Sequence, residues 1–206
     1  MNFKQLVLAS LFVLVGTIGS FAQAEEQSGA IKTKDGLLIV WNEPGNFYTV
    51  EIKGKKIDPI PNQMLWFMVD DKFFQIATPK TEQFAKGVTS ARDILTAHMK
   101  WEVDYISSLL KVTVTPTSSW LKLRNGTEAN SWSYEMPKVA EKQTARKQLY
   151  LSVVKRNHVF LVNSPVEGTE DEKVIFDRLV NAMETLVSSD KALPLSKASE
   201  KIKTNN

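Results

Sequence analysis

The sequence contains no cysteine among its 206 residues. This absence excludes disulfides, thiol nucleophiles, iron–sulfur clusters and thiolate zinc sites. A small exported domain often uses disulfides to compensate for a thin core, so this chain must rely on packing instead. A cysteine that could carry a lipid anchor is also missing, and we therefore expect no lipoprotein.

The sequence also lacks an excess of charge of one sign. It has 26 Lys and Arg against 23 Asp and Glu, which gives a formal net charge of +3. Proteins that bind nucleic acids concentrate basic residues on one face, and the near balance argues against such a partner. It also provides no strong field that would steer a charged substrate.

Long apolar runs are absent except near the N-terminus, where Leu6–Ile18 follows Lys4. The run is shorter than the roughly 20 residues that span a bilayer, and Ala22-Gln23-Ala24 fits the small-x-small cleavage pattern. The sequence therefore predicts a signal peptide over residues 1–24, cleaved after Ala24. We expect a periplasmic or secreted protein with no transmembrane anchor.

The first half of the remaining chain has the alternation and turn residues of strands. Leu37–Trp41 and Phe47–Ile52 are rich in residues that favour strands, and Met64–Val69 and Phe73–Ala77 resemble the two arms of a hairpin. A loop with two prolines, Asp58–Asn62, separates the two pairs. The sequence predicts four strands in this half.

Apolar spacing then changes to that of a helix over Ser90–Leu110. Ser90 and Asp93 resemble a capping box at its start. The predicted buried stripe consists of Ile94, His98, Trp101, Tyr105 and Leu109.

Two hairpins are predicted after this helix. One joins Trp120–Arg124 to Ser131–Met136, and the other joins Gln148–Lys155 to His158–Asn163 through Arg156-Asn157. The polar segment between the hairpins, 138–147, is expected to be a loop or a short helix.

A second helix is predicted after the hairpins, with Thr169 and Glu172 as its capping box. Strands joined by tight turns favour an antiparallel sheet. We therefore predict an α+β fold in which an antiparallel sheet packs against two long helices, an α/β/α-type sandwich. Residues 25–188 form its single domain, and the polar residues 189–206 form a flexible tail. The expected buried stripe of the second helix is Phe176, Leu179, Val180, Met183 and Val187.

Residues that could perform catalysis are few, because the chain has two histidines and no Gly-x-Ser-x-Gly motif. His98 and Glu102 are one helical turn apart and could act as an acid–base pair, as in a hydrolase. A metal would need a third ligand that the sequence does not provide, so we predict no metal site and no cofactor. His158 begins a strand after a tight turn and is expected to face solvent.

Five tryptophans are many for a domain of this size. Trp66 and Trp101 lie in apolar runs and are expected in the core. Trp120 and Trp132 flank a predicted turn, and exposed aromatic rings provide large contact areas for ligands. Together with His98, they are the candidate ligand-binding residues.

The order of elements from Ala91 to Ser188 resembles a known family. A long helix leads into Trp132-Ser133-Tyr134, then Gln148–Leu151, then His158–Val162, and a helix with Phe176-Asp177-Arg178-Leu179 closes the pattern. This layout is similar to the PsbP-like superfamily, which includes the photosystem II extrinsic protein and bacterial DcrB-type periplasmic proteins. The resemblance implies an antiparallel sheet between helices and a mostly non-enzymatic accessory or binding protein. It carries over no catalytic or metal residue.

The sequence thus predicts an exported, soluble binding or accessory module of the bacterial envelope, without catalytic activity. Its partner would be an envelope protein or a small ligand that the sequence does not identify. Two alternatives remain open, which are an envelope hydrolase using His98 and Glu102 and a carrier of a hydrophobic ligand.

Overall fold

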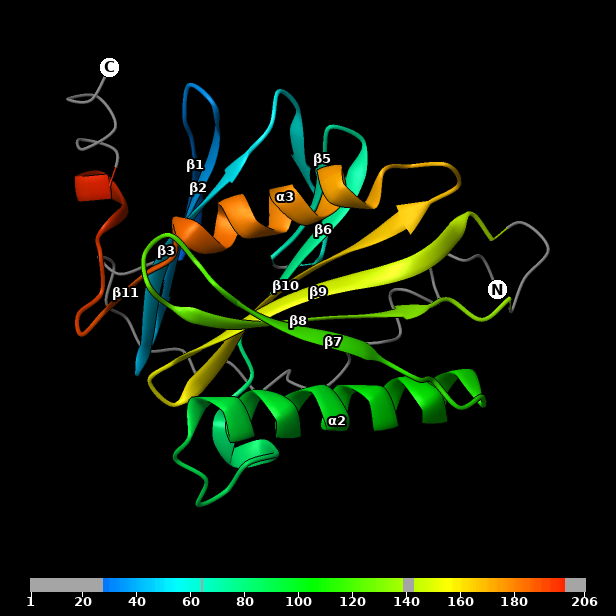
Figure 1. Ribbon diagram of the computed structural model, residues 1–206. Coiled ribbons are helices and arrows are strands. Elements are labelled where there is room, and N and C mark those ends of the chain that lie inside the picture. The colour runs from blue at the N-terminus through cyan, green and yellow to red at the C-terminus, as the bar shows by residue number, and fades with distance from the viewer. Residues whose placement is uncertain (1–27, 64, 139–142, 199–206) are drawn as a thin grey trace.

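Antiparallel strands dominate the computed structural model, which describes residues 28–63, 65–138 and 143–198 (Figure 1). The predicted signal peptide, residues 1–24, lies outside these ranges. In chain order the elements are β1 (Gly29–Lys32), β2 (Gly36–Glu43), β3 (Asn46–Lys53), β4 (Ile57–Pro59), β5 (Trp66–Val69), β6 (Lys72–Ala77), the 3₁₀ helix η1 (Thr81–Gln83), α2 (Ala91–Leu110), β7 (Thr117–Lys122), β8 (Glu128–Glu135), β9 (Ala145–Lys155), β10 (His158–Glu167), α3 (Glu172–Glu184) and β11 (Val187–Ser189).

The strands form two sheets. The small sheet has the order β1-β2-β3-β11, and the large sheet has the order β4-β5-β6-β10-β9-β8-β7. Helix α2 covers one face of the large sheet, and α3 lies on the opposite face, where it also contacts β3 of the small sheet (Figure 1). The predicted α+β class and antiparallel pairing are confirmed.

One detail of the predicted architecture is wrong, since the structure has two sheets. The first four predicted strands do not all join one sheet, because β2 and β3 pair with β1 and β11 in the separate small sheet. The prediction of two long helices is borne out only in part, since α2 has 20 residues and α3 has 13.

The first half of the chain contains more strands than the predicted four. Strand β1 pairs with β2, and β4, which overlaps the predicted proline loop at Asp58 and Pro59, pairs with β5. Both extra strands are very short, with four and three residues. Their own composition therefore gives little signal, and their partners in space define them.

Both predicted hairpins in the second half are confirmed. Strands β9 and β10 pair along their length, and the pair nearest the turn is Lys155 with His158. Arg156 and Asn157 therefore form a two-residue turn. In the hairpin of β7 and β8, the pair nearest the connecting loop is Lys122 with Glu128. Ala145, which was expected in a loop, already belongs to β9.

Both α2 and α3 begin at a residue whose side chain caps the helix, but only the cap of α2 is the predicted residue. The Ser90 hydroxyl accepts a hydrogen bond from the Asp93 amide at 3.4 Å, which confirms the predicted cap of α2. The cap of α3 is Asp171, whose carboxylate accepts from the Lys173 amide at 2.9 Å. The predicted cap, Thr169, is wrong because the helix begins at Glu172, directly after Asp171.

The buried face of α2 is rotated from the predicted stripe. Glu102, Val103 and Ile106 are buried, whereas Leu109 is exposed. Ile94 and His98 of the predicted stripe are buried, at 6% and 0% exposure. On α3, Leu179 and Met183 are buried as predicted.

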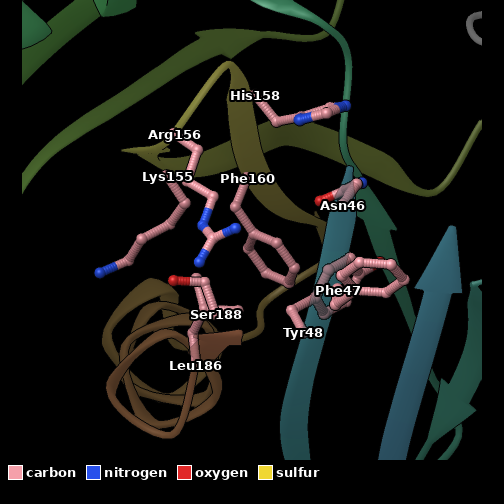
Figure 2. Close-up of a pocket in the computed structure, with 9 residues that line it drawn as sticks. All are labelled: Asn46, Phe47, Tyr48, Lys155, Arg156, His158, Phe160, Leu186 and Ser188. Atoms are coloured by element: carbon pink, nitrogen blue, oxygen red, sulfur yellow. The ribbon is translucent and has the colours of Figure 1, made fainter. Parts of the chain in front are cut away.

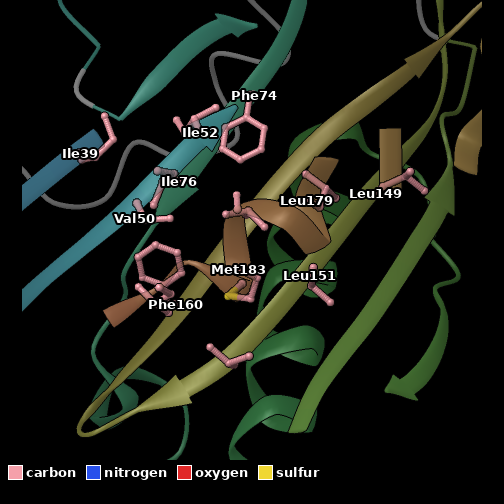
Figure 3. Packing of buried hydrophobic residues seen from close by; sticks show 14 of the residues in the cluster. Ile39, Val50, Ile52, Phe74, Ile76, Leu149, Leu151, Phe160, Leu179 and Met183 are labelled. Carbon is pink, nitrogen blue, oxygen red and sulfur yellow. The ribbon is translucent and has the colours of Figure 1, made fainter. Parts of the chain in front are cut away.

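The main apolar core lies between the two sheets and against α3 (Figure 3). Alternate residues of β9 and β10 point into this core, and their neighbours point toward α2. Prominent members of the core are Ile39, Val50, Ile52, Phe74, Ile76, Leu149, Leu151, Phe160, Leu179 and Met183.

The C-terminal segment differs from the flexible tail expected from residue 189. Ser189 belongs to β11 and pairs with Phe47. The Asn42 amide group donates to the Leu193 carbonyl at 2.9 Å and accepts from the Leu193 amide at 3.0 Å. Ala198 is buried. The described part of this segment therefore packs on the small sheet, while residues 199–206 lie outside the described ranges.

Among the helices in the described ranges, none is both long enough and apolar enough to cross a membrane.

Candidate functional site

The predicted acid–base pair lies in the interior, on the face of α2 that packs against the large sheet. His98 and Glu102 have exposed side-chain fractions of 0% and 4%, and His98 Nε2 lies 3.6 Å from Glu102 Oε1. That separation is slightly longer than a normal hydrogen bond. The helix brings the two residues together as the sequence predicts, but it buries both of them.

Burial also removes the charge from both groups at neutral pH. It lowers the pKa of His98 to about 3 and raises the pKa of Glu102 to about 8. The imidazole is therefore neutral and the carboxyl group is protonated. Two phenols from the sheet lie near this carboxyl group, and burial raises the pKa of Tyr134 to about 12 and that of Tyr150 well above its ordinary value.

The predicted aromatic surface does not form, because Trp132 is buried. It has an exposed fraction of 1%, and its ring stacks on Tyr150 with centroids 3.7 Å apart. Trp132 faces α2 rather than solvent, which corrects the expectation that it lines a surface site. Trp120 is only partly buried, and the Arg92 guanidinium lies 5.1 Å from its ring centroid.

The sheet face beneath α2 carries many polar groups, unlike the face beneath α3. The side chains of Gln148, Asn163 and Gln75 form a hydrogen-bonded chain across β9, β10 and β6. Within the described residues, several buried polar atoms of this layer have no hydrogen-bond partner: Gln75 Nε2, His98 Nδ1, His98 Nε2, Asn130 Oδ1 and Trp132 Nε1. A layer of this composition does not suit a purely hydrophobic ligand.

A small pocket opens elsewhere, between β3, the β9–β10 turn and the segment that joins α3 to β11 (Figure 2). It lies where the main apolar core ends, because Tyr48 and Phe160 belong to that core and also line the pocket. The lining residues are Asn46, Phe47, Tyr48, Lys155, Arg156, His158, Phe160, Leu186 and Ser188.

Buried polar groups and aromatic rings form the inner wall of this pocket. Tyr48 packs edge-on against Phe160, with ring centroids 4.8 Å apart. His158 Nδ1 is buried and has no hydrogen-bond partner among the described residues, whereas the Tyr48 hydroxyl lies beside the side chain of Thr78. His158 is 3% exposed, so the expectation that it faces solvent is wrong. Its ring points inward because it shares a strand face with Phe160.

The charge of the pocket comes from the β9–β10 turn. In Figure 2 the Arg156 guanidinium lies between Phe160 and Ser188, whereas the Lys155 ammonium group points away. Arg156 forms an ion pair with Asp190, and Lys155 donates to the Thr127 hydroxyl at 3.3 Å. Burial raises the pKa of Tyr48 and lowers the pKa of His158, so both are neutral at neutral pH.

The pocket therefore brings together one guanidinium, which is paired with Asp190, and two side chains that are neutral at neutral pH, Tyr48 and His158. It was not predicted, because its residues come from three segments that are far apart in the sequence. The three-residue run Lys155–Asn157 could have been noticed only as a charged hairpin turn. The described residues contain no group of His, Asp and Glu that could hold a metal ion.

The fold places this protein among the α+β proteins whose antiparallel sheets are covered by helices. Among solved structures, the chain is similar to the solution structure of cyanobacterial PsbP (CyanoP) from Synechocystis sp. PCC 6803. The identity is 10%, the match covers 85% of this chain and 99% of that one, and the TM-score is 0.42. This is the resemblance that the layout predicts, and it concerns the fold alone. No family model matches the chain, and no curated protein matches it.

Proposed function

We propose that this protein is an exported binding or accessory module of the bacterial envelope that catalyses no reaction. The observation that supports the proposal is the small pocket of Figure 2, which Arg156, Tyr48 and His158 line and in which the buried His158 Nδ1 has no hydrogen-bond partner among the described residues. Buried polar groups in native proteins are almost always hydrogen-bonded. A ligand or partner that supplies this bond would stabilise the pocket.

The hydrolase alternative is less well supported. A general base must reach the proton that it removes, directly or through one water. His98 is fully buried and Glu102 is protonated at neutral pH, so the pair presents neither an accessible base nor a carboxylate to orient the imidazole. A hydrolase would have to displace α2 before its chemistry could begin.

The carrier of a hydrophobic ligand is also less favoured. The large apolar cluster of Figure 3 is filled by side chains from both sheets and α3. The layer beneath α2 contains buried amides and phenols that an alkyl chain would leave without partners.

Export rests on the sequence of residues 1–24. We expect the mature protein to begin at Glu25 and to act in the periplasm or outside the cell, because Ala22-Gln23-Ala24 fits a cleavage site. The intact mass of the exported protein tests this step. Retention of residues 1–24 would contradict it.

Complementation of a deletion strain separates binding from catalysis. Two variants alter the pocket, Tyr48→Phe and Arg156→Gln, and two remove the acid–base pair, His98→Gln and Glu102→Gln. We expect loss of function only for the pocket variants, with all four proteins at normal abundance. Complete loss confined to His98→Gln and Glu102→Gln, at normal abundance, would reject the binding module and favour the enzyme.

A further inference from the structure

We infer that α2 is a hinged cover, which swings away from the large sheet while both sheets stay folded, and that ionisation of Glu102 controls how often it opens. The inference goes beyond the proposed binding function, because it concerns a movement of the fold and requires no ligand. Three features support it: the connections of α2, the composition of the layer beneath the helix, and the surroundings of Glu102.

The strands that α2 connects do not need the helix for their own pairing. Strand β6 precedes α2 and pairs with β5 and β10, and β7 follows α2 and pairs with β8. In the large sheet, β10, β9 and β8 lie between these two strands. Movement of α2 away from the sheet (Figure 1) therefore breaks no hydrogen bond between paired strands.

Both ends of α2 lead into exposed segments of the chain. Residues 86–90 before the helix and residues 111–113 after it are all exposed. Gly87 and Lys111 have positive φ values of 78° and 56°, so the backbone changes direction in each segment. The chain can bend at these two places without moving a buried side chain, and we assign them as the hinges.

The layer beneath α2 holds the helix less firmly than a purely apolar interface would. Both ring nitrogens of His98 and the indole nitrogen of Trp132 are buried without a hydrogen-bond partner among the described residues. Such groups destabilise the closed position, because water can bond to them once the helix has moved. Apolar contact keeps the cover closed, and it comes from the buried helix residues Ile94, Leu95, Val103 and Ile106.

Glu102 has no cation to stabilise a negative charge in this layer. The titratable groups that face it are His98 on its own helix, Tyr134 from β8 and Tyr150 from β9. The face of β10 beneath α2 contributes Val159 and apolar neighbours. Among the described residues, no Lys or Arg forms an ion pair with Glu102. Ionisation is therefore unfavourable while α2 is closed.

Opening of α2 removes this penalty, so the movement depends on pH. Burial raises the pKa of Glu102 to about 8, and exposure to water returns it to its ordinary value of 4.5. A rise of pH through this window therefore favours the open position. His98 favours opening at low pH, because burial lowers its pKa to about 3 from 6.5. Together, the two groups should raise the opening constant about tenfold from pH 6 to pH 8.

The absence of cysteine allows one buried thiol to be introduced on either face of the large sheet. Ser152 and Ser164 are both 0% exposed. Ser152 lies on the face of β9 toward α2, whereas Ser164 lies on the face of β10 toward α3, as Phe160 and Val162 do. We would label Ser152→Cys and its matched control Ser164→Cys with iodoacetamide at several pH values. Each rate is divided by that of the same variant unfolded in urea, which removes the pH dependence of the thiol itself.

We expect faster relative labelling of Ser152→Cys than of Ser164→Cys, because α2 opens without unfolding of the whole protein. The relative rate for Ser152→Cys should rise about tenfold from pH 6 to pH 8. Addition of Glu102→Gln should remove this rise. Asp104→Asn should retain it, because Asp104 lies on the exposed side of α2. In the wild-type protein, hydrogen exchange of the buried Trp132 indole N–H is a second measure of opening.

Three results would overturn the inference. Equal relative labelling of the two thiols at every pH would show that α2 leaves the sheet only when the whole protein unfolds. A rate for Ser152→Cys that does not rise with pH, or that rises equally with Glu102→Gln, would reject the role of Glu102. Protection of the Trp132 indole N–H as strong as that of the β9 amides would reject the cover, even if neither cysteine variant folded.

Discussion

Glu102 and His98 are the clearest case in which burial, rather than residue type, decides what a side chain can do. One helical turn separates them, and both face the large sheet from α2. The pKa of Glu102 is raised to about 8 from an ordinary value of 4.5, and the pKa of His98 is lowered to about 3 from 6.5. The pair is therefore neutral in the folded protein over a wide range around neutral pH.

This neutrality gives stability a defined dependence on pH. The unfolded chain releases the Glu102 proton above about 4.5, whereas the folded protein holds it until about 8. Folding thus becomes less favourable as pH rises through that window. The unfolded chain binds a proton on His98 below about 6.5, and the folded protein does so only below about 3. Folding therefore also weakens as pH falls through that second window.

We predict that Glu102→Gln removes the alkaline part of this dependence. In urea melts, the wild-type midpoint should fall between about pH 5 and pH 8, and the midpoint of the variant should change much less. Asp104→Asn is the matched control, because Asp104 lies on the exposed side of α2, where it pairs with Lys100. Parallel pH profiles for wild type and Glu102→Gln would contradict the burial of a neutral carboxyl group.

We predict a structural role for Trp132 and a minor one for Trp120. Trp132 is buried and stacked on Tyr150, so Trp132→Ala should lower the free energy of unfolding by about 3–5 kcal/mol. Trp120→Ala should lower it by about 1 kcal/mol, because Trp120 is partly exposed beside Arg92. Urea melts of the two variants measure the difference. Equal small losses of unfolding free energy for the two variants would contradict the burial of Trp132.

At the scale of elements, local chemistry determined which parts were predictable. Hairpins were predicted because their turn residues and alternating strands are contiguous in the sequence. Strands β1 and β4 were not predicted, because each is defined by its pairing with a neighbouring strand rather than by its own sequence. Strand β4 also contains Pro59, a residue that usually argues against a strand. The pocket could not be predicted for the same reason: Tyr48, Arg156 and Leu186 meet only after the two sheets have formed.

The junction of α3 with the small sheet provides a test at this scale. The Thr185 hydroxyl accepts a hydrogen bond from the Glu51 amide at 2.9 Å and lies 2.7 Å from the Ala182 carbonyl. Strand β11 begins at Val187, which pairs with Thr49 of β3. The Thr185 hydroxyl thus provides β3 with a hydrogen-bond partner at Glu51, next to the part of β3 that pairs with β11. We predict that Thr185→Val, which keeps the side-chain shape, lowers the free energy of unfolding by about 1–2 kcal/mol.

Thr96→Val is the matched control for this junction. The Thr96 hydroxyl bonds the Arg92 carbonyl of its own helix at 2.8 Å and is exposed. Its replacement should change the free energy of unfolding by less than about 0.5 kcal/mol. If urea melts gave the same loss for both variants, the side chain of Thr185 would not connect α3 to β3.

Helix α3 contributes to the stability of the whole molecule because it packs against both sheets. It contacts β9 and β10 of the large sheet and β3 of the small sheet. Its buried residues belong to the same cluster as Val50 of the small sheet and Leu151 of the large sheet (Figure 3). The two sheets should therefore unfold together, although they share no backbone hydrogen bonds between named strands.

Leu179→Ala tests this coupling, since Leu179 is fully buried at the centre of α3. We predict a loss of about 2–5 kcal/mol in the free energy of unfolding, from lost apolar contact and the cavity left behind. Urea melts followed by circular dichroism and by tryptophan fluorescence should shift together, because the sheets lose a common support. Val174→Ala on the same helix, where Val174 is 57% exposed, should be nearly neutral. Two separate transitions for Leu179→Ala would show that the small sheet folds independently of the large one.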